Sequence, residues 1–285
     1  MALMICIISG CEEKGCTNSS SFNYNAEATQ NDGSCLEMFG CLGYNTGYSN
    51  SGQKGLSLGN PYYDQKMIEE IGLQQSFFNG VPASVYILYE PSIEYRNAYA
   101  NQNGEILFGY HMFYYTISNF NELAAAGILA HEWGHRVQFT AGWNTTMQNP
   151  HLELEADAFS GYYMALGKAW AWSQIEGYYA STYATGDYNF NHPTHHGTPN
   201  QRLAAAYLGV QTAIDAVNSN KNYTYNELHQ LFITAISNDI LINIKGKSGE
   251  SSIYRRIANG SAKGKNNNIL DHIPFDQRKK LFPKL

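Results

Sequence analysis

The sequence predicts an α+β protein in which a small antiparallel sheet is followed by a helical bulk. Two observations indicate this class: short β-branched and aromatic runs lie between residues 85 and 110, and segments with the apolar spacing of helices follow from residue 121. The third observation is size, because 44% of the 285 residues are hydrophobic. That is enough to bury one large core.

The first two elements expected are a helix and a strand. Apolar residues recur near helical spacing over Tyr62–Phe78, and Asn79 with Gly80 ends this segment. Val85–Tyr89 is a β-branched and aromatic run that Pro91 stops, so we expect a strand there.

A hairpin and four helices are expected next. Asn103-Gly104 is a strong signal for a tight turn between strands at Tyr95–Gln102 and Glu105–Tyr110. One of these strands is expected to present a free edge to an extended peptide, with Ala98–Ala100 and Asn101 as contact positions, and the sequence does not decide which strand it is. The helices are expected at Asn121–Phe139, His151–Gln174, Asn200–Asn218 and Tyr225–Ile236.

The N-terminal part differs in composition from the rest of the chain. Residues 42–60 are mainly Gly, Ser, Asn and Tyr without helical or strand periodicity, which predicts a flexible linker. The expected organisation is a signal over 1–11, a Cys-bounded module over 12–41, the linker, and one domain over 61–285. All five cysteines lie in the first 41 residues, at Cys6, Cys11, Cys16, Cys35 and Cys41.

The first eleven residues resemble the signal of a bacterial lipoprotein. An apolar run, Met1–Ile8, precedes Ser9-Gly10-Cys11, which is similar to the lipobox at which such precursors are cleaved. The resemblance implies acyl chains on Cys11 that attach the protein to a membrane, with about 0.8 kcal/mol gained per buried CH₂. We therefore expect a lipid-anchored or secreted protein of the bacterial cell envelope.

The segment that follows resembles a short Cys-bounded module of secreted bacterial proteins. The resemblance implies a disulfide between Cys16 and Cys35, worth on the order of 3 kcal/mol in an exported, oxidising compartment. Cys41 is either free or an alternative partner of Cys35. Asn31 and Asp32 offer oxygens to Ca²⁺, and an Asx-rich turn is the simpler interpretation of the same residues.

The charge of the chain excludes one class of partner. Its 18 basic and 24 acidic residues give a net charge of −6, which argues against a nucleic-acid-binding protein. No apolar run approaches the ~20 residues of a membrane-spanning helix.

The motif with clear chemistry is His131-Glu132-Trp133-Gly134-His135, of the form H-E-x-x-H. On a helix the two histidines lie about 40° apart, so both imidazoles can bind one Zn²⁺. Glu132 lies about 60° from His135, beside the metal, where it can act as a general base. The motif occurs by chance on solvated helices, but this helix is rich in alanine and poor in charge.

Three blocks of sequence resemble the bacterial neutral zinc metallopeptidases, which are gluzincin-type enzymes. The resemblance implies a zincin-like fold and a third zinc ligand from an E-x-x-x-D pattern, which Glu153 and Asp157 match. Asp157 would then accept the remaining N–H of a zinc-bound histidine. Glu155, about 200° from Glu153 on the helix, is the alternative ligand. The blocks are Ala130–Gln138, Glu153–Gly161 and His196–Arg202.

The third block has two interpretations. Thr198 and Gln201 form a capping box with Pro199 at the first helical position, so the block starts a helix. A histidine just before that helix can also stabilise the oxyanion of a tetrahedral intermediate. We assign that role to His196, with His195 as the alternative.

The function expected is therefore a surface-tethered peptidase with one catalytic Zn²⁺. Its ligands are His131, His135 and Glu153, Glu132 is the base, and the partner is a peptide or protein substrate. The alternative is a zinc-binding surface lipoprotein without turnover, acting in binding or adhesion. Retention of Glu132 favours the enzyme, because a structural zinc site needs no base.

Overall fold

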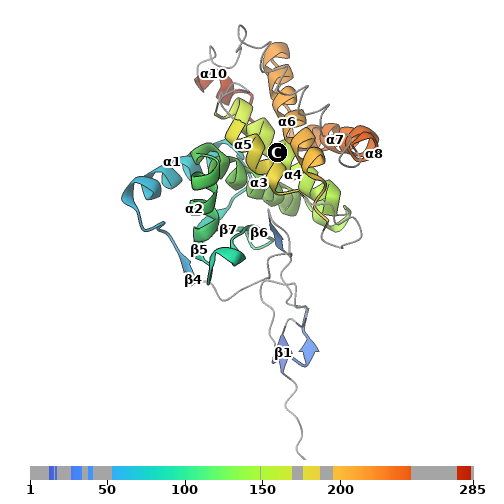
Figure 1. Ribbon diagram of the computed structural model, residues 1–285. Helices are drawn as coiled ribbons and strands as arrows, with labels where there is room; N and C mark the ends of the chain where they lie inside the picture. Colours follow the sequence, from blue (N-terminus) through green and yellow to red (C-terminus); the bar gives the residue numbers. More distant parts are fainter. Residues whose placement is uncertain are drawn as a thin grey trace, which may run out of the picture. The chain divides into compact units, whose positions relative to one another are not determined.

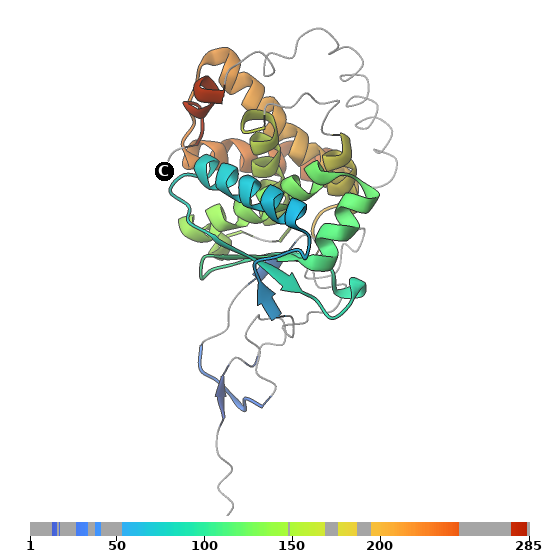
Figure 2. The same ribbon diagram turned by 90° about the vertical axis from the view of Figure 1, so that its left-hand side faces the viewer.

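Figures 1 and 2 show the computed structural model of the chain. It consists of two compact units, Met1–Met38 and Phe39–Leu285. The lipobox and all five cysteines, including the pairing expected for Cys16 and Cys35 and the open role of Cys41, lie outside the described residues. The structure describes residues 13–15, 17, 27–33, 38–40, 53–147, 149–168, 176–186, 195–244 and 275–283.

The first unit contains two very short strands. β1 (Lys14–Gly15) pairs in parallel with β2 (Gln30–Asn31). The amide of Gly33 donates a hydrogen bond to the side-chain oxygen of Asn31, 3.0 Å away. This is an Asx turn, the simpler of the two interpretations of this segment.

The second unit contains a mixed sheet with the strand order β3-β6-β7-β5-β4. The prediction of an antiparallel sheet is wrong at one ladder, because β5 and β7 are parallel. After β5 the chain forms β6, which does not pair with β5, and β7 then lies between these two strands. The strands are β3 (Met38–Gly40), β4 (Gln53–Gly55), β5 (Ser84–Tyr89), β6 (Ala98–Asn101) and β7 (Glu105–Gly109).

The hairpin is confirmed, but the expectation of a free edge on one of its strands is wrong. β6 and β7 are antiparallel, and Gly104 in the turn has φ +92°. β7 lies in the middle of the sheet, and β6 has β3 on its other side. Neither strand is therefore an edge of the sheet, because β3 and β4 occupy the two ends.

The end of the expected linker is ordered. Residues 53–55 form β4, which is antiparallel to β5. Leu58 is fully buried in the core, and the Asn60 side chain accepts a hydrogen bond from the Tyr62 amide at the start of α1. Local composition favoured a tether here, but pairing with β5 and burial of a single leucine order the segment.

Helices make up most of the second unit, and the expected ones are found close to their expected bounds. α2, α5, α8 and α10 were not expected. The helix expected to reach Gln174 is described to Leu166, and residues 169–175 lie outside the described part. The helices are α1 (Pro61–Phe77), α2 (Tyr110–Asn119), α3 (Glu122–Ala141), α4 (Asn149–Leu166), α5 (Glu176–Ala184), α6 (Pro199–Ser219), α7 (Tyr225–Ala235), α8 (Leu241–Asn243) and α10 (Phe275–Lys279).

α3, α4 and α6 pack unusually closely at the centre of this unit (Figures 1 and 2). A Cβ atom on Gly161 of α4 would overlap the carbonyl oxygen of Ala206, and one on Gly209 of α6 would overlap that of Ala158. A Cβ on Gly134 of α3 would lie 2.9 Å from the Cα of Ala156. These glycines let the helix backbones touch, so polar side chains between the helices are removed from water. Within the described residues no helix is both long and apolar enough to cross a bilayer.

Candidate metal centre

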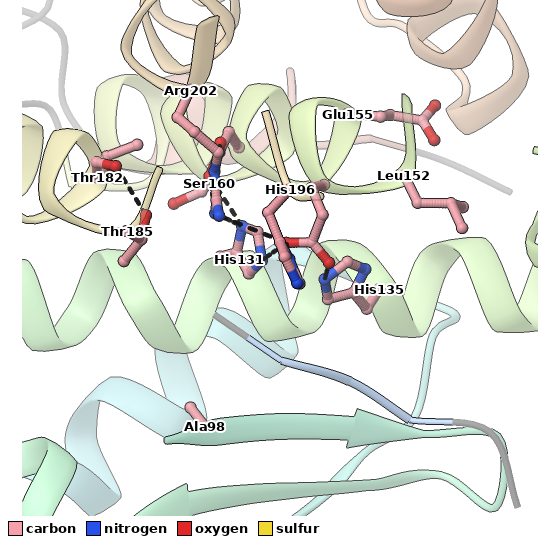
Figure 3. Close-up of polar contacts among 12 residues, drawn as sticks. Ala98, His131, His135, Leu152, Glu155, Ser160, Thr182, Thr185, His196 and Arg202 are labelled. Atoms are coloured by element: carbon pink, nitrogen blue, oxygen red, sulfur yellow. Dashed lines mark hydrogen bonds and ion pairs between the residues drawn. The ribbon is translucent and has the colours of Figure 1, made fainter. Parts of the chain in front are cut away.

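The two histidines of the H-E-x-x-H motif face a carboxylate from the next helix. His131 and His135 lie on α3 and Glu153 lies on α4, and all three are buried. His131 Nε2 is 3.4 Å from Glu153 Oε2, and His135 Nε2 is 3.4 Å from Glu153 Oε1. Figure 3 shows His131 and His135 turned toward the same point between the helices. This group could hold a metal ion.

The geometry of the group fits a tetrahedral metal. Ligand atoms about 2.0–2.1 Å from a tetrahedral Zn²⁺ lie about 3.4 Å from one another. Each histidine nitrogen lies at this separation from one of the two carboxylate oxygens of Glu153, and the ligand atoms of the three residues all lie within 4.8 Å of one another. His131 Nε2 and both carboxylate oxygens of Glu153 are buried, and within the described residues none of them makes a hydrogen bond of good geometry. Since buried polar atoms normally have partners, a cation bound among these atoms would satisfy them.

The other nitrogen of His131 contacts a buried acid. His131 Nδ1 donates to Asp157 Oδ1 over 2.9 Å, which leaves Nε2 for a metal. Burial alone lowers the pKa of His131, but its hydrogen bond with Asp157 and the charge of that residue outweigh burial and raise the pKa to about 9. A cation that binds His131 Nε2 therefore competes with protonation of this histidine.

Arg202 of α6 neutralises the acid that supports His131. Its guanidinium group contacts both carboxylate oxygens of Asp157, with Nη2 2.9 Å from Oδ1. Arg202 Nη1 also lies 3.5 Å from Glu153 Oε2. Arg202 is 1% exposed, so the pair is shielded from water. This one arginine therefore links α6 to the carboxylates of α4 on both sides of His131.

His135 is oriented by a neutral side chain. Its Nδ1 donates to Gln138 Oε1 over 2.8 Å, and Gln138 Nε2 donates to Glu155 Oε2 and to the Leu152 carbonyl. The second oxygen of Glu155 lies 2.6 Å from His229 Nδ1 of α7. Glu155 therefore faces away from His131 and His135, as Figure 3 shows, and Glu153 is the carboxylate that lies against the two histidines.

The third sequence block reaches the centre through His196. Its Nδ1 lies 3.1 Å from Glu153 Oε2, and the imidazole is buried. Burial raises the pKa of Glu153, but His196 and His135 outweigh it and hold the pKa well below its ordinary value. His195 is also buried. The capping box of Thr198 is formed as expected. The block therefore both starts α6 and places His196 beside Glu153.

Sequence reasoning did not assign three residues that contact the site residues. Arg202 lies in the third block, and the signal available in the sequence was a single arginine in an alanine-rich helical segment. Gln138 stood in the first block, three residues after His135. His229 carried no local signal, because it reaches Glu155 from α7 and stacks on Trp143 with ring centroids 3.8 Å apart.

The chain matches no model of a known protein family, no curated protein and no solved structure with which it was compared.

Proposed function

We propose that the chain is a zinc-dependent peptidase of the gluzincin type with a zincin-like fold. The observation that carries this proposal is the buried group of His131, His135 and Glu153, whose ligand atoms lie within 4.8 Å of one another. Three protein ligands leave a fourth position for substrate or water, as in catalytic zinc sites. Glu132 is buried on α3 between the two histidines, where a structural site would need no carboxylate.

The proposed mechanism assigns a role to three side chains besides the metal ligands. When bound, Zn²⁺ polarises the scissile carbonyl and lowers the pKa of a water molecule. Glu132 removes the proton of the attacking water and delivers it to the leaving amine. His196, held beside Glu153, donates a hydrogen bond to the carbonyl oxygen as negative charge develops there. Asp157 keeps His131 in the tautomer that leaves Nε2 for the metal.

The decisive experiment separates metal binding from turnover. We expect the zinc-loaded protein to cleave casein, and Glu132→Gln to retain zinc while losing cleavage. His196→Ala should lower kcat by about two orders of magnitude if His196 stabilises the oxyanion. Cleavage that survives a chelator or the Glu132→Gln change contradicts the mechanism. Stoichiometric zinc without any cleavage supports the alternative of a zinc-binding surface protein.

The same proposal extends to location. The lipobox-like sequence at Cys11 supports attachment to the bacterial cell envelope. Loss of palmitate labelling in Cys11→Ala is the expected result, and unchanged labelling contradicts it.

A further inference from the structure

The candidate metal centre is closed in this structure. Its ligands are 3% exposed or less, and Glu132 is fully buried. A peptidase must bring an extended peptide to such a group. The strand that packs most extensively against α3, the helix of His131 and His135, is β6. A hydrogen bond from Arg136 to the Asn101 carbonyl holds the end of β6 to this helix.

Both sides of β6 are paired with other strands. It pairs with β7 on one side, with Tyr99 opposite Leu107. On its other side it is hydrogen-bonded to β3 (Met38–Gly40). Figure 3 shows β3 as the blue ribbon between α3, with His131 and His135, and the strand that carries Ala98. The boundary between the compact units falls within β3, so Phe39 and Gly40 belong to the unit that contains the metal centre.

An extended peptide bound by strand addition would use the same backbone groups of β6. We propose that β3, through its residues Phe39 and Gly40, occupies the substrate-binding side of β6, so that this strand is an intramolecular inhibitor of the peptidase. This inference rests on the proposed function, because it assigns β3 the position of a substrate strand. The occupant is the chain itself, and the substrate class that it indicates is an extended peptide.

The length of β3 makes this inhibition reversible. It has three residues, and alternate residues of a strand direct their backbone groups to the same neighbour, so few hydrogen bonds hold it to β6. Such a segment depends on its covalent attachment, which keeps its local concentration high. A longer substrate strand, or a cut in the attachment, can therefore displace it.

The test removes the backbone donors of β3. Phe39→Pro with Gly40→Pro removes both N–H groups, one of which must face β6 whichever register the strands adopt. The matched control is Gln53→Pro with Lys54→Pro in β4, the opposite edge of the sheet. All variants are made in the full chain.

The first readout is binding and needs no turnover. In the Glu132→Gln background we measure fluorescence anisotropy of a labelled peptide of residues 34–45 with its cysteines changed to serine. We expect at least tenfold tighter binding to the β3 variant than to its parent, and no gain in the β4 control. Equal binding to all three proteins overturns the inference.

The second readout is hydrolysis of a quenched fluorescent peptide by the zinc-loaded proteins with Glu132 intact. We expect kcat/KM to rise at least tenfold in the β3 variant alone. Hydrolysis that is equal in all proteins overturns the inference and leaves the proposed function standing. Tighter peptide binding without hydrolysis in any protein overturns the proposed function and leaves the occupation of β6 standing.

A second route does not depend on the folding of the proline variant. A site for a specific protease is placed between residues 45 and 48, and the purified protein is cut without removing any segment. We expect the cut to raise binding of the labelled peptide at least tenfold. An unchanged affinity after complete cutting overturns the inference.

Discussion

Replacing Asp157 by asparagine should change how zinc binding depends on pH. Asp157 accepts the Nδ1 proton of His131 and raises the pKa of that histidine to about 9. Asparagine keeps a hydrogen-bond acceptor at this position but removes the charge. Burial and the nearby Arg202, which both lower the pKa of His131, are then opposed mainly by the hydrogen bond of His131 with Glu153. We expect His131 in Asp157→Asn to be neutral at pH 7.

Two effects of this change oppose one another at neutral pH. In the wild-type protein the pKa of His131 lies about two units above pH 7, so a cation must displace the proton of this histidine. This competition weakens zinc binding at pH 7 about 100-fold, or by about 2.7 kcal/mol. Asp157→Asn removes this competition. It also removes the charge that supports the metal-bound histidine, which costs about 10–100-fold in affinity. The two proteins should therefore bind zinc similarly at pH 7, and the wild type should bind about 10–100-fold tighter at pH 9.

The assay is competition with a chromophoric zinc chelator between pH 6.5 and 9, together with calorimetry in buffers of different ionisation enthalpy. We expect the wild type to release about one proton more than Asp157→Asn on binding zinc at pH 7. Glu90→Gln, which removes a buried carboxylate bonded to backbone amides elsewhere, is the control and should leave the proton count unchanged. Equal proton release and parallel pH profiles in wild type and Asp157→Asn would refute the reasoning.

Three further predictions concern ligand identity, helix packing and pH. Glu153→Ala should lose the bound zinc and Glu155→Ala should keep one equivalent by metal analysis; loss in both would contradict the assignment. Gly161→Ala should lower the free energy of unfolding by about 1–3 kcal/mol, since its Cβ meets backbone, whereas Gly72→Ala, with nothing nearby, should raise it by about 0.4–1 kcal/mol in denaturant titrations. The raised pKa of His131 adds up to about 3 kcal/mol to the free energy of unfolding of the metal-free protein. This contribution is complete below pH 6.5 and is lost as the pH rises through about 9, so unfolding midpoints that do not change with pH would contradict it.

Local patterns predicted what depends on neighbours in the chain. The i, i+4 spacing of His131 and His135 places both rings on one side of any helix. The capping box of Thr198 and the Asn103-Gly104 turn are also decided within a few residues, and both are present. Helix geometry also separates Glu153 from Glu155, because residues two positions apart on a helix point in different directions.

Contacts between distant segments could not be predicted from these patterns. α2 follows β7 without a break, so a strand ending in Tyr110 and a helix beginning there looked alike until packing decided between them. Leu58 lies in a Gly- and Ser-rich stretch, and only a cavity supplied by other elements could bury it. The strand order has the same cause, because composition does not say which strands pair.

The sequence by itself therefore determined the chemistry available at the centre: two histidines on one helix face, a neighbouring carboxylate base, and an acidic helix that follows. The tertiary structure alone decided that Arg202 neutralises Asp157 and that β3 lies against β6, and it brought Glu153, which the E-x-x-x-D pattern had indicated, to both histidines. The physical reason is that helix phase is a short-range property, whereas the burial and pairing of these groups depend on backbones that meet only when the whole unit folds.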